Sequence, residues 1–184
     1  YDPSWPVTPV IKAIFATIFC IYVIYNKLLL SSSRIVNKKI KIYIFSPFSF
    51  IGGDTLSLSR LIKNLNPKIY DISFICLKKT KITNYLKNKN YKIIKINSER
   101  TLFSINKIRL IIKNDLNKKF HKYIFISNQN YANIVSVLLL YKLPKIKLIL
   151  IERNHIDEFK YQKTFKNFII KILIKYFYKK ANVI

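Results

Sequence analysis

Residues 39–184 alternate between short apolar runs and amphipathic segments, and this alternation limits the possible folds more than any other feature. The apolar runs predict strands, at 40–46, 69–77, 91–96, 122–127 and 146–152. The other segments predict helices, at 54–65, 80–88, 101–116, 130–142 and 161–179. A chain that repeats strand and helix in this way forms a parallel sheet with helices on both faces. We therefore expect an α/β, Rossmann-like domain over 39–184.

Apolar side chains at helical spacing indicate the faces of three predicted helices. The helix at 54–65 has Asp54 as its candidate N-cap and stops at Asn66-Pro67. Its apolar stripe consists of Leu58, Leu61, Ile62 and Leu65. The helix at 101–116 is expected to point four side chains inward: Ile105, Ile108, Ile112 and Leu116. The basic helix at 161–179 places five on one face: Phe165, Phe168, Ile169, Ile172 and Tyr176.

Residues 1–38 have a different composition and form a separate region. After a Pro-rich lead, residues 9–30 are the most apolar part of the chain, and about 22 helical residues span roughly 33 Å, enough for a bilayer core. We expect a transmembrane helix at 9–30 and a polar linker at 31–38. Positive residues gather after this span, which predicts that the domain lies on the cytoplasmic face of the inner or plasma membrane. A buried helix or packing arm is the main alternative. A secretory signal peptide is less favoured, because the segment has no basic n-region and no A-x-A site.

Composition excludes several classes of protein. The chain has only two Gly, two Cys outside any CxxC and two His, which argues against glycine repeats, disulfide scaffolds, zinc fingers and a His-based metal site. The net charge of +26 suggests attraction to an anionic membrane surface or to nucleic acid. The excess is nearly all Lys and is scattered, whereas readers of bases usually use Arg. We therefore expect no nucleic-acid partner.

Ligands bind beyond the carboxyl ends of the strands in sheets of this kind, so the loops that follow the strands are the candidate sites. The first loop holds the only two glycines, Gly52 and Gly53, followed by Asp54, and either lets a phosphate approach the backbone or makes a strained turn. The fourth includes Asn128, which could bind a sugar hydroxyl or belong to an N-cap region. The fifth is dense in polar groups, Glu152-Arg153-Asn154-His155, and is either a binding loop or an ion-paired surface loop.

Three stretches, in order, resemble family 4 glycosyltransferases, which have the GT-B architecture. The first is Gly52-Gly53-Asp54-Thr55 followed by LSRLIKNL and a strand after Pro67. The second is SNQNYANIVSVLLLYKLPKIKLILIERNHIDEF at 127–159, and the third is KILIKYFYKKANVI at 171–184. The resemblance covers about residues 39–184, and residues 1–38 lie outside it.

The resemblance implies the N-terminal, acceptor-side half of a retaining glycosyltransferase. Such an enzyme moves a sugar from a nucleotide sugar to a lipid-linked or glycan acceptor, without a metal or other cofactor. Gly52 and Gly53 would approach the phosphate, and Arg153 would offset charge on the departing diphosphate. Many relatives carry a His directly after the fifth strand, where this chain has Glu152 and Arg153, with His155 two residues on.

The family's E-x7-E pair, which holds the donor, belongs to a second domain that this sequence does not reach, so we expect the chain to be inactive alone. The alternative function is a non-catalytic, basic, membrane-tethered α/β module that binds nucleotides or nucleic acid. A basic face with exposed aromatic side chains would favour that module, whereas the first and fifth loops at one sheet edge would favour the glycosyltransferase.

Overall fold

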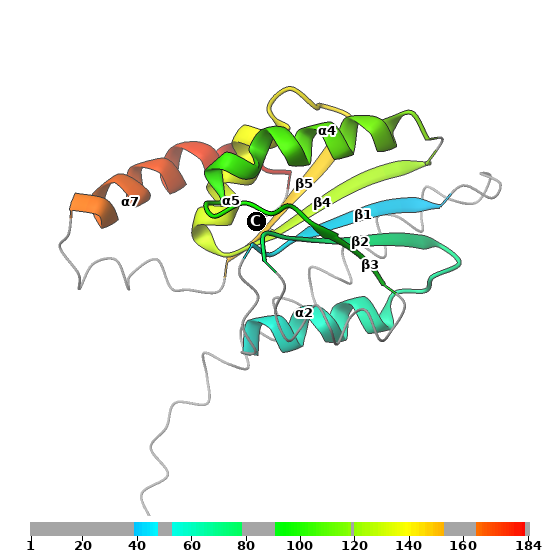
Figure 1. Ribbon diagram of the computed structural model, residues 1–184. Helices are drawn as coiled ribbons and strands as arrows, with labels where there is room; N and C mark the ends of the chain where they lie inside the picture. The colour runs from blue at the N-terminus through cyan, green and yellow to red at the C-terminus, as the bar shows by residue number, and fades with distance from the viewer. Residues whose placement is uncertain (1–38, 48–52, 79–90, 119, 153–164, 183–184) are drawn as a thin grey trace, which may run out of the picture. The chain divides into compact units, whose positions relative to one another are not determined.

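The computed structural model describes residues 39–47, 53–78, 91–118, 120–152 and 165–182 (Figure 1). The described strands form one five-stranded sheet in the order β3-β2-β1-β4-β5, and every pairing is parallel. The strands are β1 (Ile40–Phe45), β2 (Tyr70–Cys76), β3 (Lys92–Lys95), β4 (Lys122–Asn128) and β5 (Ile146–Ile151). The expected parallel sheet is confirmed.

Helices cover both faces of the sheet. Figure 1 shows α2 (Gly53–Asn64) below the sheet, and α4 (Ile105–Leu116), α5 (Asn130–Leu140) and α7 (Phe165–Phe177) on the opposite side. Short 3-10 turns precede α4, as η1 (Leu102–Ser104), and follow α7, as η2 (Tyr178–Lys180). The helix expected at 80–88 and the span expected at 9–30 lie outside the described residues. Within the described ranges, no helix has both the length and the apolar character that a membrane crossing requires.

The central strands are buried on both faces because helices cover both sides of them. All six residues of β1 are buried, and its alternate side chains Tyr43 and Phe45 join the core beneath α4 and α5. On the other side, Leu58 and Ile62 of α2 are buried as their spacing predicted. The edge strand β3 is only half covered.

The structure differs from the sequence interpretation at two helix starts. Asp54 is the second residue of α2, so it lies in the first turn instead of the N-cap position expected for it. The expected helix at 101–116 divides into η1 and α4, and the buried Ser104 hydroxyl donates to the carbonyl of Thr101 at 2.6 Å. A side chain that bonds its own backbone three residues back favours this tighter turn over an α-helical one.

Candidate functional site

The direction of chain travel across the sheet reverses between β1 and β4. The chain runs outward from β1 to β2 and β3, returns to the other side of β1 as β4, and continues to β5. In sheets of this type, ligands bind beyond the carboxyl ends of the strands at the position of such a reversal, and this position between β1 and β4 is here named the crevice. Here the register pairs Phe45 of β1 with Ser127 of β4, and Asn128 of β4 with Ile151 of β5. The polar ends of β4 and β5 therefore lie next to the crevice.

The turn from β4 into α5 has an unusual backbone. Gln129 has φ 93° and ψ 138°, a conformation that favours glycine. A non-glycine residue held in this way stores about 1–3 kcal/mol of strain, and such strain gathers at functional sites. The carbonyl of Gln129 accepts a 2.8 Å hydrogen bond from the Asn133 backbone N–H. The strained turn thus leads directly into the first turn of α5.

Four side chains form a hydrogen-bonded cluster at this edge. The Asn133 side-chain amide donates to the Ile151 carbonyl and to the Tyr178 hydroxyl, each at 3.1 Å. Tyr178 donates in turn to Oε2 of Glu152 at 2.5 Å. Asn130, with its amide nitrogen turned toward the carboxylate, donates to both oxygens of Glu152, with Oε2 at 2.9 Å. The cluster fixes the Glu152 carboxylate from α5 and from η2.

The Tyr178 phenol is held in its neutral form. Burial, and then the hydrogen bond to Glu152, raise the pKa of Tyr178 well above its ordinary value. Because the phenol keeps its proton, it acts as a hydrogen-bond donor to Glu152. Glu152 therefore presents an oriented, hydrogen-bonded carboxylate at the sheet edge, which suits it to accept hydrogen bonds from ligand hydroxyls.

Buried polar atoms next to this cluster lack a partner among the described residues. They are the Ser127 hydroxyl, both the oxygen and the nitrogen of the Asn128 amide, and the Asn133 amide oxygen. Asn128 is 1% exposed, so its amide is removed from bulk water. An unpaired buried polar group costs about 1–3 kcal/mol. Several such atoms at one strand end indicate a place built for a polar ligand or for ordered water.

A shallow cavity of about 420 Å³ lies farther along the same edge, at the ends of β2 and β3. Asn97, which has φ 50°, lines it together with Ser98 and Glu99. The carboxyl edge is therefore polar on both sides of β1.

The described structure places two of the residues expected from sequence, Asn128 and Glu152, at the ends of the neighbouring strands β4 and β5. Gly53 begins α2 at the same edge, after β1. Gly52, Arg153, Asn154 and His155 lie outside the described residues, so their roles stay predictions. The described chain has no glycine with a positive φ, so Gly53 itself makes no strained turn.

Sequence reasoning missed several members of the cluster. Asn130 lies two residues after Asn128, and Asn133 follows Asn130 by three residues, which is about one helical turn. That spacing was a usable signal. Tyr178 lies 26 residues beyond Glu152, and no local pattern indicates their contact.

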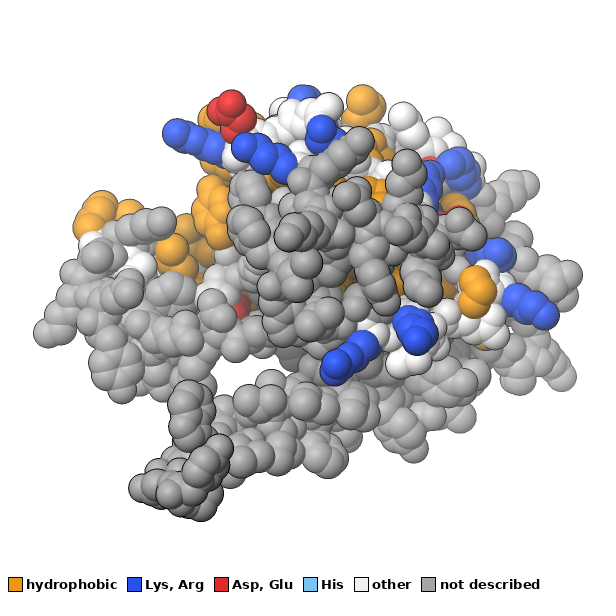
Figure 2. All heavy atoms as spheres, turned by 60° about the horizontal axis from the view of Figure 1, so that its bottom comes forward, with side chains coloured by type: hydrophobic (Ala, Val, Ile, Leu, Met, Phe, Trp, Pro, Cys, Tyr) orange, Lys and Arg blue, Asp and Glu red, His pale blue; other side chains and the backbone are white. Residues whose placement is uncertain are grey.

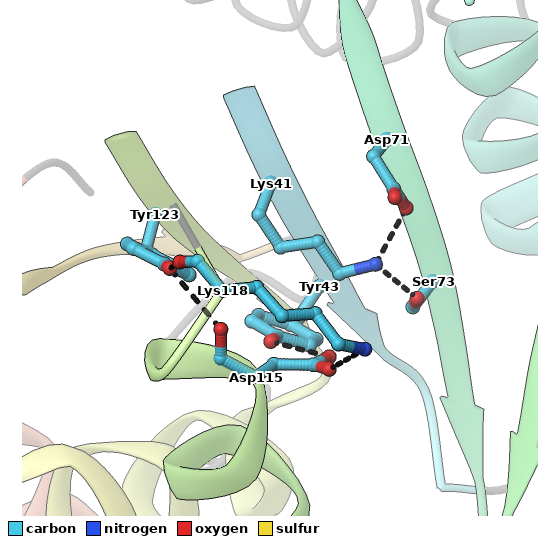
Figure 3. Close-up of polar contacts among 7 residues, drawn as sticks. All are labelled: Lys41, Tyr43, Asp71, Ser73, Asp115, Lys118 and Tyr123. Carbon is cyan, nitrogen blue, oxygen red and sulfur yellow. Dashed lines mark hydrogen bonds and ion pairs between the residues drawn. The ribbon is translucent and has the colours of Figure 1, made fainter. Parts of the chain in front are cut away.

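A second polar network occupies the opposite, amino-terminal edge of the sheet (Figure 3). Lys41 of β1 is 2% exposed and pairs with Asp71 at 2.5 Å and with the Ser73 hydroxyl at 2.8 Å. Around Asp115 of α4, Tyr43 donates to one carboxylate oxygen at 2.9 Å and Lys118 to the other at 2.7 Å. Because this network ties the end of α4 to the strands and lies away from the crevice, we assign it a structural role.

A basic cavity, also of about 420 Å³, lies beside this network at the start of β4 and β5. Its lining includes four lysines and a histidine, with aromatic side chains between them: Lys118, Phe120, His121, Lys122, Tyr123, Lys145 and Lys147. No acidic residue lines it among the described residues. The cavity is thus suited to an anion.

The sequence matches no protein-family model and no curated protein. Two solved structures are similar to part of the chain. The apo form of the lipopolysaccharide outer core galactosyltransferase WaaB is 17% identical over 71% of this chain and 37% of its own, with a TM-score of 0.47. MurG of Acinetobacter baumannii is 15% identical over 61% of this chain and 34% of its own, with a TM-score of 0.43. The chain therefore spans little more than a third of either protein, and at these identities no residue role is transferred from them.

Proposed function

We propose that this chain is the acceptor-side domain of a glycosyltransferase that moves a sugar from a nucleotide sugar to a lipid-linked or glycan acceptor. The observation that carries the proposal is that the buried Asn128 amide, unpaired within the described structure, and the oriented Glu152 carboxylate lie at the ends of neighbouring strands. The order of the family 4-like stretches in the sequence supports the same assignment.

The chemistry of this edge suits a sugar. A sugar hydroxyl both donates and accepts a hydrogen bond, and an Asn amide offers one group of each kind. The Glu152 carboxylate would accept from a second hydroxyl, and the unpaired Ser127 hydroxyl could serve a third. A site built to bond a hydroxyl rejects analogues that lack it, because its own polar groups would then stay unpaired.

The finer parts of the proposal rest on the sequence resemblance. We expect retention of configuration, a donor held by a second domain, and no turnover by this chain alone. Gly52 and Gly53 would approach the phosphate, and Arg153 would offset charge on the leaving diphosphate. We further propose that the domain works on the cytoplasmic face of a membrane, anchored by residues 9–30. In an active two-domain enzyme, Arg153→Ala should abolish transfer, and near-normal turnover would rule out this role.

The direct test is binding of ligands to the whole chain. Isothermal titration calorimetry with a panel of soluble glycosides, including alkyl glycosides as acceptor mimics, should identify a glycoside that binds to the chain through contacts with Asn128. Asn128→Ala should weaken its binding about tenfold or more, since a polar contact within a buried site is lost. The matched control is Asn117→Ala, an exposed asparagine at the end of α4 near the amino-terminal edge, which should leave binding unchanged.

Two results would contradict the proposal. One is that no glycoside in the panel binds. The other is that the Asn128→Ala and Asn117→Ala variants bind the glycoside equally well, which would show that the glycoside does not bind at the crevice.

The basic cavity at the amino-terminal edge favours the second candidate function, a module that binds nucleotides or nucleic acid without catalysis. Lysines and aromatic side chains together suit phosphates and bases. Filter binding with a mixed-sequence oligonucleotide at two salt concentrations tests this function. Tight binding that Lys145→Ala with Lys147→Ala weakens, in a chain that binds no glycoside, would establish the second candidate in place of the first.

A further inference from the structure

Helix α7 has apolar side chains on two opposite faces. One face packs inward, where Ile174 is buried and its neighbours Ile170, Leu173 and Phe177 lie against the core. The other face points to solvent and carries five large apolar side chains, here named the α7 outer stripe: Phe165, Phe168, Ile169, Ile172 and Tyr176. In Figure 2, hydrophobic side chains gather at the left, over α7.

The α7 outer stripe is continuous. Its spacing of i, i+3, i+4, i+7 and i+11 follows one face of a helix, as the sequence predicted. The exposed fraction is 79% for Phe165, 60% for Phe168 and 64% for Tyr176. Tyr141, at the end of α5, is 72% exposed and extends the surface, because Lys180 lies over the rings of both Tyr141 and Tyr176. Single exposed apolar residues are ordinary, but a contiguous patch indicates an interaction surface.

Lysines lie on both sides of the α7 outer stripe. Residues 165–180 contain five lysines and no acidic residue. Lys175 and Lys179 are exposed, and Lys180 places its ammonium 5.1 Å from the centre of the Tyr176 ring. Lysines beside an apolar face extend their charge into water or toward phosphates while their stems cover the apolar surface. This combination is typical of helices that lie in the interface of an anionic bilayer.

We propose that the α7 outer stripe inserts into the interfacial layer of an anionic bilayer, with its lysines among the lipid phosphates. Charge complementarity favours this occupant. A second copy of the chain would itself carry a net charge of +26, with lysines along the same stripe, which opposes self-association. The inference rests on the membrane part of the proposed function and names the surface that meets the lipid. It can fail while glycoside binding at the crevice stands.

The test must separate α7 from residues 9–30, which could bring the chain to lipid by themselves. We therefore use a single tryptophan as a fluorescent probe, which reports whether its own position is in contact with the acyl chains. In the full chain with Trp5→Phe, Phe168→Trp places the single tryptophan on the α7 outer stripe. The matched control is Ile69→Trp, because Ile69 is 45% exposed and precedes β2 at the amino-terminal edge. Both positions are exposed, so neither change disturbs the core, and circular dichroism checks folding.

Vesicles of phosphatidylcholine alone, or with 30% phosphatidylglycerol, carry brominated acyl chains that quench a tryptophan in contact with them. We expect quenching at position 168 to exceed that at position 69 at least threefold on the anionic vesicles, and to fall at least twofold on the neutral ones. Equal quenching at the two positions, no quenching at 168, or no dependence on the anionic lipid would overturn the proposal. A dimer of the chain in the absence of lipid is a further outcome to be tested. If Phe168→Glu dissociated such a dimer, the α7 outer stripe would be a surface for a second copy, and the proposal would be overturned as well.

Discussion

Lys41 is a charged residue within a strand that is buried along its whole length. Its ammonium is neutralised by Asp71 and lies 5.4 Å from the ring centre of Tyr43 and 5.6 Å from that of Phe120. A buried charge is tolerated only when it is paired in this way. Removing one partner of such a pair is more damaging than replacing the charge by an apolar group of similar size. The network in Figure 3 therefore fixes how β1, β2 and α4 fit together more than it adds net stability.

Asp115 makes stability depend on pH. Burial alone would raise its pKa, but hydrogen bonds from Lys118 and Tyr43 outweigh burial and hold the pKa of Asp115 below its usual value. A carboxyl group whose pKa is lowered in the folded state stabilises the fold above its unfolded pKa of about 3.9, and this contribution is lost as pH falls through the folded pKa. We predict that Asp115→Asn costs about 1–3 kcal/mol at pH 7 and flattens the loss of stability in acid.

Urea unfolding at several pH values between 3 and 7 measures both effects. Glu99→Gln, an exposed carboxylate with the same chemical change, is the control and should behave like the unchanged chain. If Asp115→Asn lost stability in acid as steeply as the unchanged chain, the carboxylate would have no part in the pH dependence.

At the scale of elements, the runs of apolar residues in the sequence were enough to predict the described strands. The ends of β1, β2, β4 and β5 fall within one or two residues of the expected positions, because a strand buried on both faces is apolar throughout. Asn66 and Pro67 ended α2 as expected, since the Asn66 side chain accepts a hydrogen bond from the Lys68 backbone and so favours a turn.

Pattern could not decide which face of α7 meets the core. Two apolar stripes lie on this helix, and the sequence interpretation identified the one that faces solvent. The two stripes are both apolar, so hydrophobicity alone does not distinguish them. Which stripe is buried depends on which one packs better against the surface beneath α7. The candidate site shows the same limit, because the contact between Glu152 and Tyr178 exists only after α7 has packed.

The two faces of α7 should respond differently to truncation. Ile174, 5% exposed, faces the core, and Ile172, 51% exposed, faces solvent. We predict that Ile174→Ala costs about 2–4 kcal/mol, because it removes buried methyl groups and leaves a cavity. Ile172→Ala is the matched control and should change stability by less than about 0.5 kcal/mol. Urea unfolding compares the two, and equal losses would mean that the faces are assigned wrongly.

At the scale of the whole molecule, a net charge of +26 acts against folding. Like charges crowded onto a compact surface repel, and added salt screens them, since the Debye length falls from about 30 Å at 10 mM to about 8 Å at 150 mM. We predict that the melting temperature rises when sodium chloride is raised from 10 to 150 mM.

Sodium sulfate at matched ionic strength is the comparison for this experiment. Equal effects of chloride and sulfate indicate screening alone. Because sulfate also stabilises folded proteins by its exclusion from their surface, only an extra effect of sulfate that Lys145→Ala with Lys147→Ala removes indicates an anion in the basic cavity. A melting temperature that stays constant or falls with sodium chloride would contradict the view that self-repulsion limits stability.

The position of β1 between β2 and β4 has a consequence for synthesis on the ribosome. One side of β1 can pair as soon as β2 emerges, but the other waits for β4, whose first residue Lys122 pairs with Ile40. At about 5–20 residues per second, the roughly 80 residues between them take roughly 4–16 seconds to make. During that interval an apolar strand has an open edge, which is prone to aggregate. The single charge within this strand, Lys41, is placed to discourage a second nascent chain from pairing there before β4 arrives.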